Sequence, residues 1–395
     1  MNLLIATDHA FLAHSSGVYD TYCFDQAFYH DYLQVFDTVQ VISRMQPCAE
    51  LPRGAFRSDG NGVSFLGVSN LRQAHWFLAA QFVAHSALRS AVEHADAVVV
   101  RVPSKLGTLA AKWARQARKP YMIEVIGDPN AALSSSGAGL HYKLMGWLES
   151  RDLKLIARYA NVGSYVSKIY LSDAYPLAPG KPIDYISSIR LDASEITGAR
   201  TFLEKPDSLK VIHVGSLTRR KRCVDLIRAC AAAKQRQVAL KLHLVGGGAE
   251  RADLEQLVKE LNITDEVVFH GHIADRQQLR MLLDDSDLFA MTTASEGLPR
   301  AIIEAMARGL PVVGARTPGV DELVRETELF PVGAVDVLVT LLSDLAGNPA
   351  RLSAMSWHSF ETVRQYTNDV LSPKRRYLYE QLKASVSADR MWQPN

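Results

Sequence analysis

The chain has 395 residues, of which 48% are apolar and 22% are charged, and its formal net charge is +2. This length exceeds what one hydrophobic core usually supports, so we expect two domains of a globular protein. The small positive charge argues against a nucleic-acid-binding protein and is compatible with contact at a membrane surface.

The sequence shows neither a membrane span nor an export signal. No apolar run reaches spanning length, and residues 1–8 become polar too early for a signal peptide. The cysteines are Cys23, Cys48, Cys223 and Cys230, and their spacing gives no CxxC pair and no ligand cluster. We therefore expect reduced thiols and a cytoplasmic location.

The first half of the chain alternates apolar strands with helices. A turn at residues 15–19 and a helical stretch through residue 32 follow the first strand, and a long helix covers residues 140–158. The predicted strands are residues 3–7, 38–42, 97–102, 121–126 and 161–167. Near-continuous apolar strands between helices indicate a parallel sheet covered on both faces. The small and polar residues 132–139 are typical of a mobile segment.

Apolar periodicity fades around residues 187–206, where we expect a linker, and then restarts. Strands are predicted at 209–215, 239–245, 266–271, 287–291 and 311–314, again separated by helices. The fold class is therefore α/β, with two Rossmann-like doubly wound domains. The expected divisions are an N-terminal domain at 1–200, a C-terminal domain at 207–347, and a helical segment at 348–395.

Residues 295–314 predict a loop, a short helix and a strand. Pro299 suits the first helical position, and Gly309 suits a left-handed C-cap. Glu296 then lies in the loop, and Glu304 lies about a turn and a half inside the helix. A helix N-terminus attracts phosphate, whereas carboxylates accept hydrogen bonds from hydroxyls. This combination fits a nucleotide-sugar, with a diphosphate in the middle and a polyol at each end.

The same stretch resembles the signature of retaining glycosyltransferases of family 4, in which two Glu are separated by seven residues. The resemblance is specific over residues 211–324 and architectural over the first domain. It implies the GT-B fold, two Rossmann-like domains facing a cleft, with the C-terminal segment crossing back to the first domain. It also implies sugar transfer from a nucleotide-sugar donor to a saccharide acceptor, through front-face attack assisted by the leaving phosphate.

The resemblance assigns the donor-binding residues one by one. Glu304 is expected to bind the ribose hydroxyls, and Glu296 the sugar hydroxyls. The N–H groups after Gly297, including that of Leu298, are expected to bind the diphosphate. The backbone of residues 269–273, ending at Ile273, matches the stretch that lies against the nucleotide base.

A glycine turn with a basic run follows the strand at 209–215. Val214, Gly215, Leu217 and Lys221 match the family pattern V-G-R-L-x-x-x-K-G, so Lys221 inherits the diphosphate-binding role. Ser216 stands where the family has Arg. Arg219, Arg220 or Arg222 is expected to replace that cation, although Arg220 and Arg222 also fit a solvated basic patch.

Several positions keep two interpretations. The turn Gly246-Gly247-Gly248 is either a tight turn or a ligand contact. Glu322 is interpreted as a helix-start residue in preference to a ligand contact. In the first domain, Ser16-Gly17 replaces a Gly-Gly turn that faces acceptor and sugar in relatives. Asp128 stands near the place of a donor-contacting His, and either holds a sugar hydroxyl or caps the next helix.

We expect no cofactor and no metal. Asp285-Ser286-Asp287 spells a D-x-D motif, but it lies just before a strand, and Lys221 with the helix N-terminus can serve the diphosphate. Two alternative functions remain: a sugar-phosphate synthase or phosphorylase on the same fold, and a binding subunit without turnover, which Ser216 and the missing His would favour.

The acceptor is expected to be a saccharide or a lipid-linked saccharide for a surface polysaccharide or glycolipid. The helix at 140–158 mixes Lys143, Arg151, Lys154 and Arg158 with Trp147 and several Leu. Such a helix can rest on anionic headgroups at the inner membrane face. In the alternative interpretation, its Leu and Trp pack against the first domain's sheet and its cations are solvated.

Overall fold

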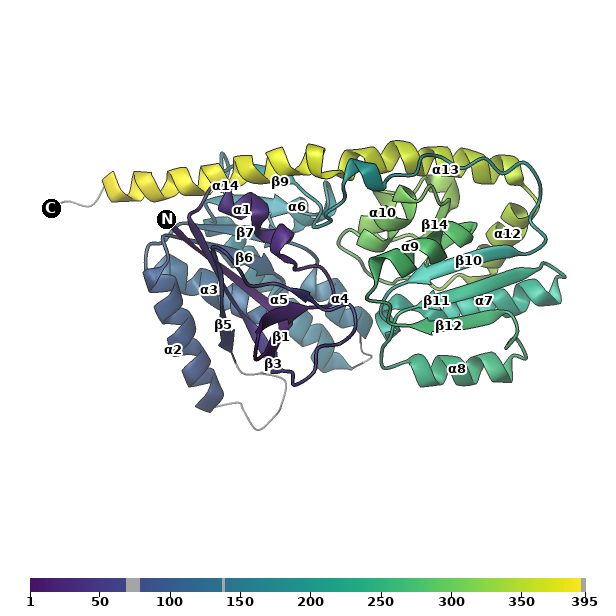
Figure 1. The fold of residues 1–395 in the computed structure, drawn as a ribbon, viewed down its shortest axis with the longest axis horizontal. Coiled ribbons are helices and arrows are strands. Elements are labelled where there is room, and N and C mark those ends of the chain that lie inside the picture. The colour runs from purple at the N-terminus through teal and green to yellow at the C-terminus, as the bar shows by residue number, and fades with distance from the viewer. Residues whose placement is uncertain (69–78, 137–138, 392–395) are drawn as a thin grey trace. The chain divides into compact units, whose positions relative to one another are not determined.

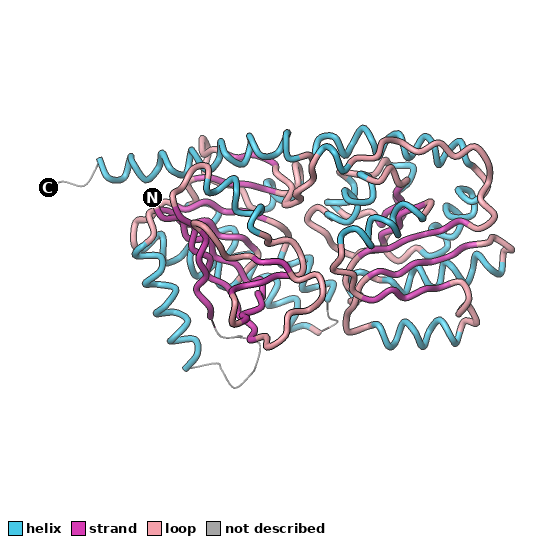
Figure 2. Tube along the Cα trace, viewed as in Figure 1, coloured by secondary structure: helices cyan, strands magenta, loops and turns pink. Residues whose placement is uncertain are grey.

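The computed structural model describes residues 1–68, 79–136 and 139–391. The chain divides into two compact units. Unit 1 comprises Met1–Pro129, Trp147–Ile186 and Leu371–Asn395, and unit 2 comprises Asn130–Gly146 and Ser187–Val370. In each unit the strands lie together and helices cover them (Figures 1 and 2).

The sheet of unit 1 is mainly parallel. Its parallel strands run in the order β5-β3-β1-β6-β7-β8-β9, and β2 and β4 add an antiparallel extension. Its strands are β1 Asn2–His14, β2 Gly17–Asp20, β3 Thr38–Pro47, β4 Phe56–Arg57, β5 Val63–Val68, β6 Ala97–Val102, β7 Tyr121–Val125, β8 Val162–Tyr165 and β9 Ile183–Tyr185. All residues of β6 and β7 are buried, as expected for parallel strands covered on both faces.

The sheet of unit 2 is parallel throughout, in the order β12-β11-β10-β13-β14-β15. Its strands are β10 Leu209–Val214, β11 Leu240–Val245, β12 Val267–Gly271, β13 Leu288–Met291, β14 Val312–Ala315 and β15 Leu329–Phe330. Both units thus have the strand order of a Rossmann fold, which confirms the predicted doubly wound α/β class.

Helices fill the connections between strands. In unit 1 they are α1 His30–Leu33, α2 Ala79–His94, α3 Lys105–Gln116 and α6 Tyr170–Ala174, with η1 Gln26–Tyr29. In unit 2 they are α7 Cys223–Gln235, α8 Arg251–Glu260, α9 Arg276–Asp285, α10 Arg300–Ala307, α11 Pro318–Asp321, α12 Val335–Ala346 and α13 Pro349–Val363, with η3 Ala193–Glu195, η4 Arg219–Lys221, η5 Glu326–Glu328 and η6 Arg364–Tyr366. The helices α4 Pro129–Ser136, α5 Leu140–Tyr159 and α14 Asn368–Met391 each contain a boundary between the units.

The sequence patterns did not predict the strands β2, β4, β5, β9 and β15. The chain after residue 19 does not enter a helix at once, because β2 extends to Asp20 and the first helical turn begins only at Gln26, capped by Asp25. The segment predicted to be mobile forms α4 over Pro129–Ser136, and residues 137 and 138 lie outside the described residues. Local composition missed β2 because its pairing with β1 and β4 fixes this backbone.

The segment predicted as a linker packs on unit 2. Arg200 donates hydrogen bonds from its guanidinium to four carbonyl groups near the C-terminal ends of α9 and α10. The acceptors are the carbonyl oxygens of Leu283, Asp284, Ser286 and Arg308. A cation at helix C-termini satisfies carbonyls that the helices leave unpaired, so this segment is part of the packed structure of unit 2. No helix in the described ranges is both long and apolar enough to cross a membrane.

Candidate functional site

Two loops at the centre of the unit 2 sheet bring predicted donor-binding residues together. The strand order reverses between β10 and β13, and the loops after these strands contain η4 and residues 292–296 respectively. In open α/β sheets, ligands bind outside the carboxyl ends of the strands at such a switch point. The topology therefore places both loops where a ligand of unit 2 is expected.

Lys221 and Glu296 form an ion pair across this switch point. Nζ of Lys221 lies 2.5 Å from Oε1 of Glu296, and the two side chains are only 11% and 12% exposed. The same oxygen accepts hydrogen bonds from Arg220 Nη1 at 3.0 Å and from Thr293 Oγ1 at 3.1 Å. Burial raises the pKa of Glu296, but the charges of Lys221 and Arg220 outweigh this effect and lower it. The carboxylate is therefore ionised at neutral pH.

His213 is a further residue near this pair, and it senses the charges of both Lys221 and Glu296. It is fully buried on β10, and Nδ1 lies 3.0 Å from the carbonyl oxygen of Ala290. That carbonyl needs a donor, so Nδ1 carries the proton and Nε2 is an acceptor. In the described part of the chain, Nε2 has no hydrogen-bond partner. The available sequence signal was a polar ring in an apolar strand, two residues before Gly215.

The pKa of His213 predicts a pH-dependent stability. Burial and the nearby Lys221 lower this pKa from 6.5 to about 4. The unfolded chain thus binds a proton between these values and the folded chain does not, so stability falls as pH drops through this window. The expected loss is about 3 kcal/mol in wild type and is absent in His213→Phe, as measured by urea unfolding at pH 7, 5.5 and 4.5. Equal pH slopes in the two proteins would contradict this, and His94→Ala, an exposed histidine, is the control.

The basic run after Gly215 separates into different roles. Arg220 donates to the backbone oxygen of Ser295 at 2.6 Å as well as to Glu296, so it is part of the site. Arg222 has a left-handed backbone (φ 51°) and pairs with the buried Asp225 at 2.6 Å, which is a structural role. Arg219 and Ser216 are exposed. The solvated-patch interpretation is thus wrong for Arg220.

The glycine triplet supports the loop that starts at Gly215. A Cβ atom on Gly246 would lie 1.8 Å from the carbonyl oxygen of Gly215, and one on Gly248 would lie 2.2 Å from that of Leu217. The N–H of Leu217 also donates to the oxygen of Gly247 at 2.8 Å. These backbones touch, so glycine is required here whether or not the turn contacts a ligand.

The helix α10 begins and ends close to the predicted residues. The sequence predicted Pro299 as the first helical residue. In the structure Pro299 is the N-cap instead, because its ψ of 108° is extended, and the helix begins at Arg300. Gly309 has φ 66°, and the N–H groups of Gly309 and Leu310 donate to the oxygens of Met306 and Ala305. This is a Schellman motif, which confirms the predicted C-cap.

The loop before α10 presents free backbone donors. Among the described residues, the N–H groups of Gly297 and Leu298 donate no hydrogen bond. The loop is held from behind by α11, since a Cβ atom on Gly319 would lie 2.1 Å from the oxygen of Gly297. Free N–H groups at a helix N-terminus favour an anion, so this loop is suited to a phosphate.

Glu304 is half-buried on α10 and its carboxylate accepts no hydrogen bond within the described ranges. Burial raises its pKa, and the positive charges of Arg300 and Arg276 counteract this only in part. A partly desolvated carboxylate without a donor is costly. It is therefore free to accept hydrogen bonds from the hydroxyls of a ligand.

In unit 1, Asp128 is already bonded. It is buried, and its carboxylate accepts hydrogen bonds from the hydroxyl groups of Tyr170 and Tyr175, the latter at 2.6 Å. Burial and this carboxylate raise the pKa values of both tyrosines, so both hydroxyls remain protonated donors. The predicted contact of Asp128 with a sugar stays a prediction.

Ser16 and Gly17 form the tip of the hairpin between β1 and β2. The hydroxyl of Ser16 lies 2.7 Å from Nδ1 of His14 and 2.9 Å from the hydroxyl of Tyr19. Gly17 has φ 144°, and a Cβ atom there would lie 2.8 Å from Asp59, so the position requires glycine. The hairpin tip is thus polar and lies beyond the carboxyl end of β1.

Residues 199–357 match the family described as "Glycosyl transferases group 1". The chain carries a group 1 glycosyltransferase domain. The domain covers η4, α10 and all the predicted donor-binding residues of unit 2. The protein is accordingly a transferase of glycosyl groups.

Similar proteins support this domain and the fold. Protein CapJ of Staphylococcus aureus is 26% identical over 323 residues, which are 81% of this chain and 80% of CapJ. The putative colanic acid biosynthesis glycosyltransferase WcaL of Escherichia coli is 33% identical over 122 residues, 29% of this chain and 30% of WcaL. The structure of HepE from Anabaena, in complex with UDP and glucose, aligns with a TM-score of 0.68 at 17% identity and covers 98% of this chain and 100% of that one. The predicted GT-B fold is confirmed.

Other predicted positions of the glycosyltransferase domain are less informative. Ile273 is half-buried and His272 is exposed, both directly after β12. Glu322 forms the C-cap of α11, which begins at Pro318, so the interpretation of Glu322 as a helix-start residue is wrong. Pro318 starts this helix because its fixed φ suits the first turn.

The D-x-D motif of the glycosyltransferase is engaged in local contacts. Asp285 pairs with Lys210 Nζ at 2.7 Å, and Asp287 accepts the backbone N–H of Lys210 at 2.9 Å. Across the described segments, no group of three or more His, Cys, Asp or Glu side chains is arranged to hold a metal ion.

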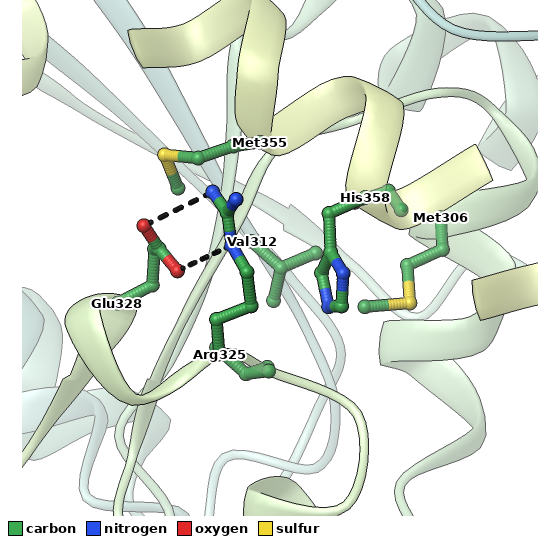
Figure 3. Close-up of a pocket in the computed structure, with 8 residues that line it drawn as sticks. Met306, Val312, Arg325, Glu328, Met355 and His358 are labelled. Carbon is green, nitrogen blue, oxygen red and sulfur yellow. Dashed lines mark hydrogen bonds and ion pairs between the residues drawn. The ribbon is translucent and has the colours of Figure 1, made fainter. Parts of the chain in front are cut away.

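A small pocket lies beside α10 and α13, lined by Met306, Val312, Met355 and His358 (Figure 3). At one side Arg325 donates hydrogen bonds to Glu328 at 3.0 and 3.2 Å. Glu328 is buried, and its charge is balanced by this arginine. His358 and Ser359 are bonded to the backbone oxygens of Leu323 and Leu310, and none of the lining residues is a predicted donor-binding residue.

Proposed function

We propose that the protein is a retaining glycosyltransferase of family 4 that moves a sugar from a nucleotide-sugar to a saccharide acceptor. The single observation that carries the proposal is the arrangement around the switch point of unit 2. There, Lys221, the largely buried carboxylate of Glu296, and the N–H groups of Gly297 and Leu298, which have no acceptor among the described residues, lie on two adjacent loops.

Each group has a role in this proposal. The diphosphate binds Lys221 and the N–H groups of the α10 loop. Glu296, no longer paired with Lys221, then accepts hydrogen bonds from the sugar hydroxyls. Glu304 accepts the ribose hydroxyls, and the stretch up to Ile273 lies against the base. Arg220, together with Lys221, offsets the charge that grows on the leaving diphosphate, which takes the proton of the attacking acceptor hydroxyl.

Similar proteins support a nucleotide-sugar donor and a role in polysaccharide biosynthesis. HepE was solved with UDP and glucose, and WcaL is described as a colanic acid biosynthesis enzyme. We therefore infer a nucleotide-sugar donor and a role in surface polysaccharide or glycolipid biosynthesis.

A thermal-shift screen against UDP-, GDP-, ADP- and dTDP-sugars tests which nucleotide-sugar the protein binds, because a ligand bound only by the folded state raises the Tm. One donor class is expected to raise it, by an amount that corresponds to about 2.7 kcal/mol at a concentration of 100 Kd. Transfer with that donor is expected to survive EDTA. Abolition by EDTA with rescue by manganese would restore Asp285 and Asp287 as metal ligands. Donor binding without transfer to any acceptor would identify a binding subunit.

A peripheral membrane contact is part of the proposal, and α5 supports it. The outward face of α5 exposes large apolar side chains, with Leu140 at 81% and Trp147 at 56%. The other exposed apolar residues of this helix are Leu144, Met145, Leu148, Leu155 and Tyr159. The cations Lys143, Arg151, Lys154 and Arg158 are exposed as well. Of the alternative interpretation, the packing of Trp147 is not observed, whereas Leu153 is buried and the cations are solvated. The exposed basic and apolar face suits anionic headgroups.

Liposome flotation measures this contact. The protein is expected to float with anionic vesicles at low salt and to be released as salt rises, since each cation contributes about 1 kcal/mol near the surface. Trp147→Glu is expected to abolish flotation. The matched control is Trp357→Glu, because Trp357 is also exposed, at 59%, but lies on α13. Absence of wild-type flotation would remove the membrane contact and leave a soluble acceptor.

A further inference from the structure

The first strand of unit 1, β1, is interrupted in its middle by a bulge at residues 7–9. Ala6 pairs with Ile42 and Ala10 pairs with Arg44, so residues 7–9 lie opposite a single residue of β3. Asp8 anchors the bulge, because its carboxylate accepts the N–H groups of Lys105 and Leu106 at the start of α3, at 2.7 and 3.1 Å. Bulges commonly re-aim a side chain next to a binding site.

The side chain that this bulge presents is His9. Its Nε2 lies 2.8 Å from Oδ1 of Asp20, and the imidazole is 21% exposed, whereas Asp20 is 2% exposed. The other oxygen of Asp20 accepts the N–H groups of Cys23 and Phe24 at 2.9 and 3.0 Å. Burial raises the pKa of Asp20, but His9 and these N–H groups lower it to about 2.

An ionised Asp20 fixes the tautomer of His9. Because the carboxylate can only accept, Nε2–H donates to it, and in the neutral imidazole Nδ1 then carries the lone pair. No residue within the described ranges donates to Nδ1. In the same ranges Cys23 Sγ forms no hydrogen bond to this nitrogen, so the group is not an arranged thiol nucleophile.

Aromatic rings enclose His9 on several sides. Phe11 and Phe24 are buried, with centroids 4.7 and 4.6 Å from that of the imidazole. Tyr22 stands edge-on at 5.9 Å and is 62% exposed. A rigid imidazole acceptor therefore lies next to an exposed aromatic ring. This pairing suits a sugar, which has donor hydroxyls at its rim and an apolar C–H face.

The topology places this pair where unit 1 is expected to bind a ligand. The strand order of the parallel sheet reverses between β1 and β6, and His9 follows the last residue of β1 that pairs with β6, Ala6. The switch point of unit 1 thus carries His9, just as that of unit 2 carries Lys221 and Glu296.

We propose that His9 and Tyr22 form the acceptor subsite, in which a saccharide hydroxyl donates to Nδ1 of His9 while the sugar packs on the ring of Tyr22. Asp20 is the positioning residue that holds the imidazole. The proposal rests on the glycosyltransferase function and assigns its acceptor contact to residues outside the group 1 domain.

The test separates acceptor use from donor use. With the donor found by thermal shift, three quantities are measured: the donor-induced Tm shift, hydrolysis of the donor by water, and transfer to a saccharide acceptor. His9→Phe keeps a ring of similar shape and removes the acceptor nitrogen, and Asp20→Asn removes the charge that fixes the tautomer. Both are expected to lower transfer kcat/KM at least tenfold while the Tm shift and hydrolysis stay unchanged. Tyr22→Ala is expected to raise the acceptor KM, and Tyr22→Phe to keep it.

The outcomes are distinct. Unchanged transfer in His9→Phe overturns the subsite, and so does an equal loss of hydrolysis and transfer, since that pattern belongs to the donor site or to misfolding. His94→Ala is the matched control and should behave as wild type. A wild-type protein that neither binds nor transfers any donor overturns the proposed function and the subsite together.

Discussion

Replacing Lys221 by alanine is expected to lower kcat by about 10²- to 10³-fold and to raise KM much less, because the ammonium stabilises charge that grows on the leaving diphosphate. Lys221 is preorganised for this, since its side chain is 11% exposed and already fixed by an ion pair with Glu296. In the proposed mechanism, the diphosphate replaces the carboxylate as the partner of Lys221.

Steady-state kinetics with the identified donor measures the effect. Lys221→Arg should recover part of the rate, since it keeps a cation with different geometry. Lys259→Ala is the surface control, because Lys259 is exposed on α8. If only KM rises, Lys221 holds the ground state alone, and the assignment to the leaving group is wrong.

Replacing Glu304 by alanine is expected to weaken donor binding by about 2–4 kcal/mol, from the loss of two hydroxyl contacts to a charged group. Folding should be little affected or even favoured. In the described structure this carboxylate makes no hydrogen bond, and burial raises its pKa despite the charges of Arg300 and Arg276, so removing it costs the folded chain no hydrogen bond.

Titration calorimetry with the donor and urea unfolding together measure both effects. Glu304→Gln keeps one acceptor oxygen and should lie between wild type and alanine. Glu260→Ala, at the exposed end of α8, is the control. A folded Glu304→Ala protein with wild-type donor affinity would contradict the assignment of Glu304 to the ribose hydroxyls.

Local sequence patterns predicted most of the fold correctly. Apolar runs gave β6 and β10 to within a residue, because a parallel strand buried on both faces must be apolar along its length. Gly309 predicted the end of α10 because only glycine adopts its φ at no cost. Patterns failed after residue 19, where Asp20 holds the chain through Cys23 and Phe24 and delays the first helix.

The sequence by itself determined the central strands of both sheets, the parallel α/β class and which residues bear charge near a helix N-terminus, since these depend on neighbours along the chain. Only the tertiary structure decided which charges meet. Lys221 and Glu296 are 75 residues apart and form a pair because β10 and β13 lie side by side. The His213 nitrogen that has no partner among the described residues, and the pairing of His9 with Asp20, are likewise consequences of burial and strand register, which no local pattern encodes.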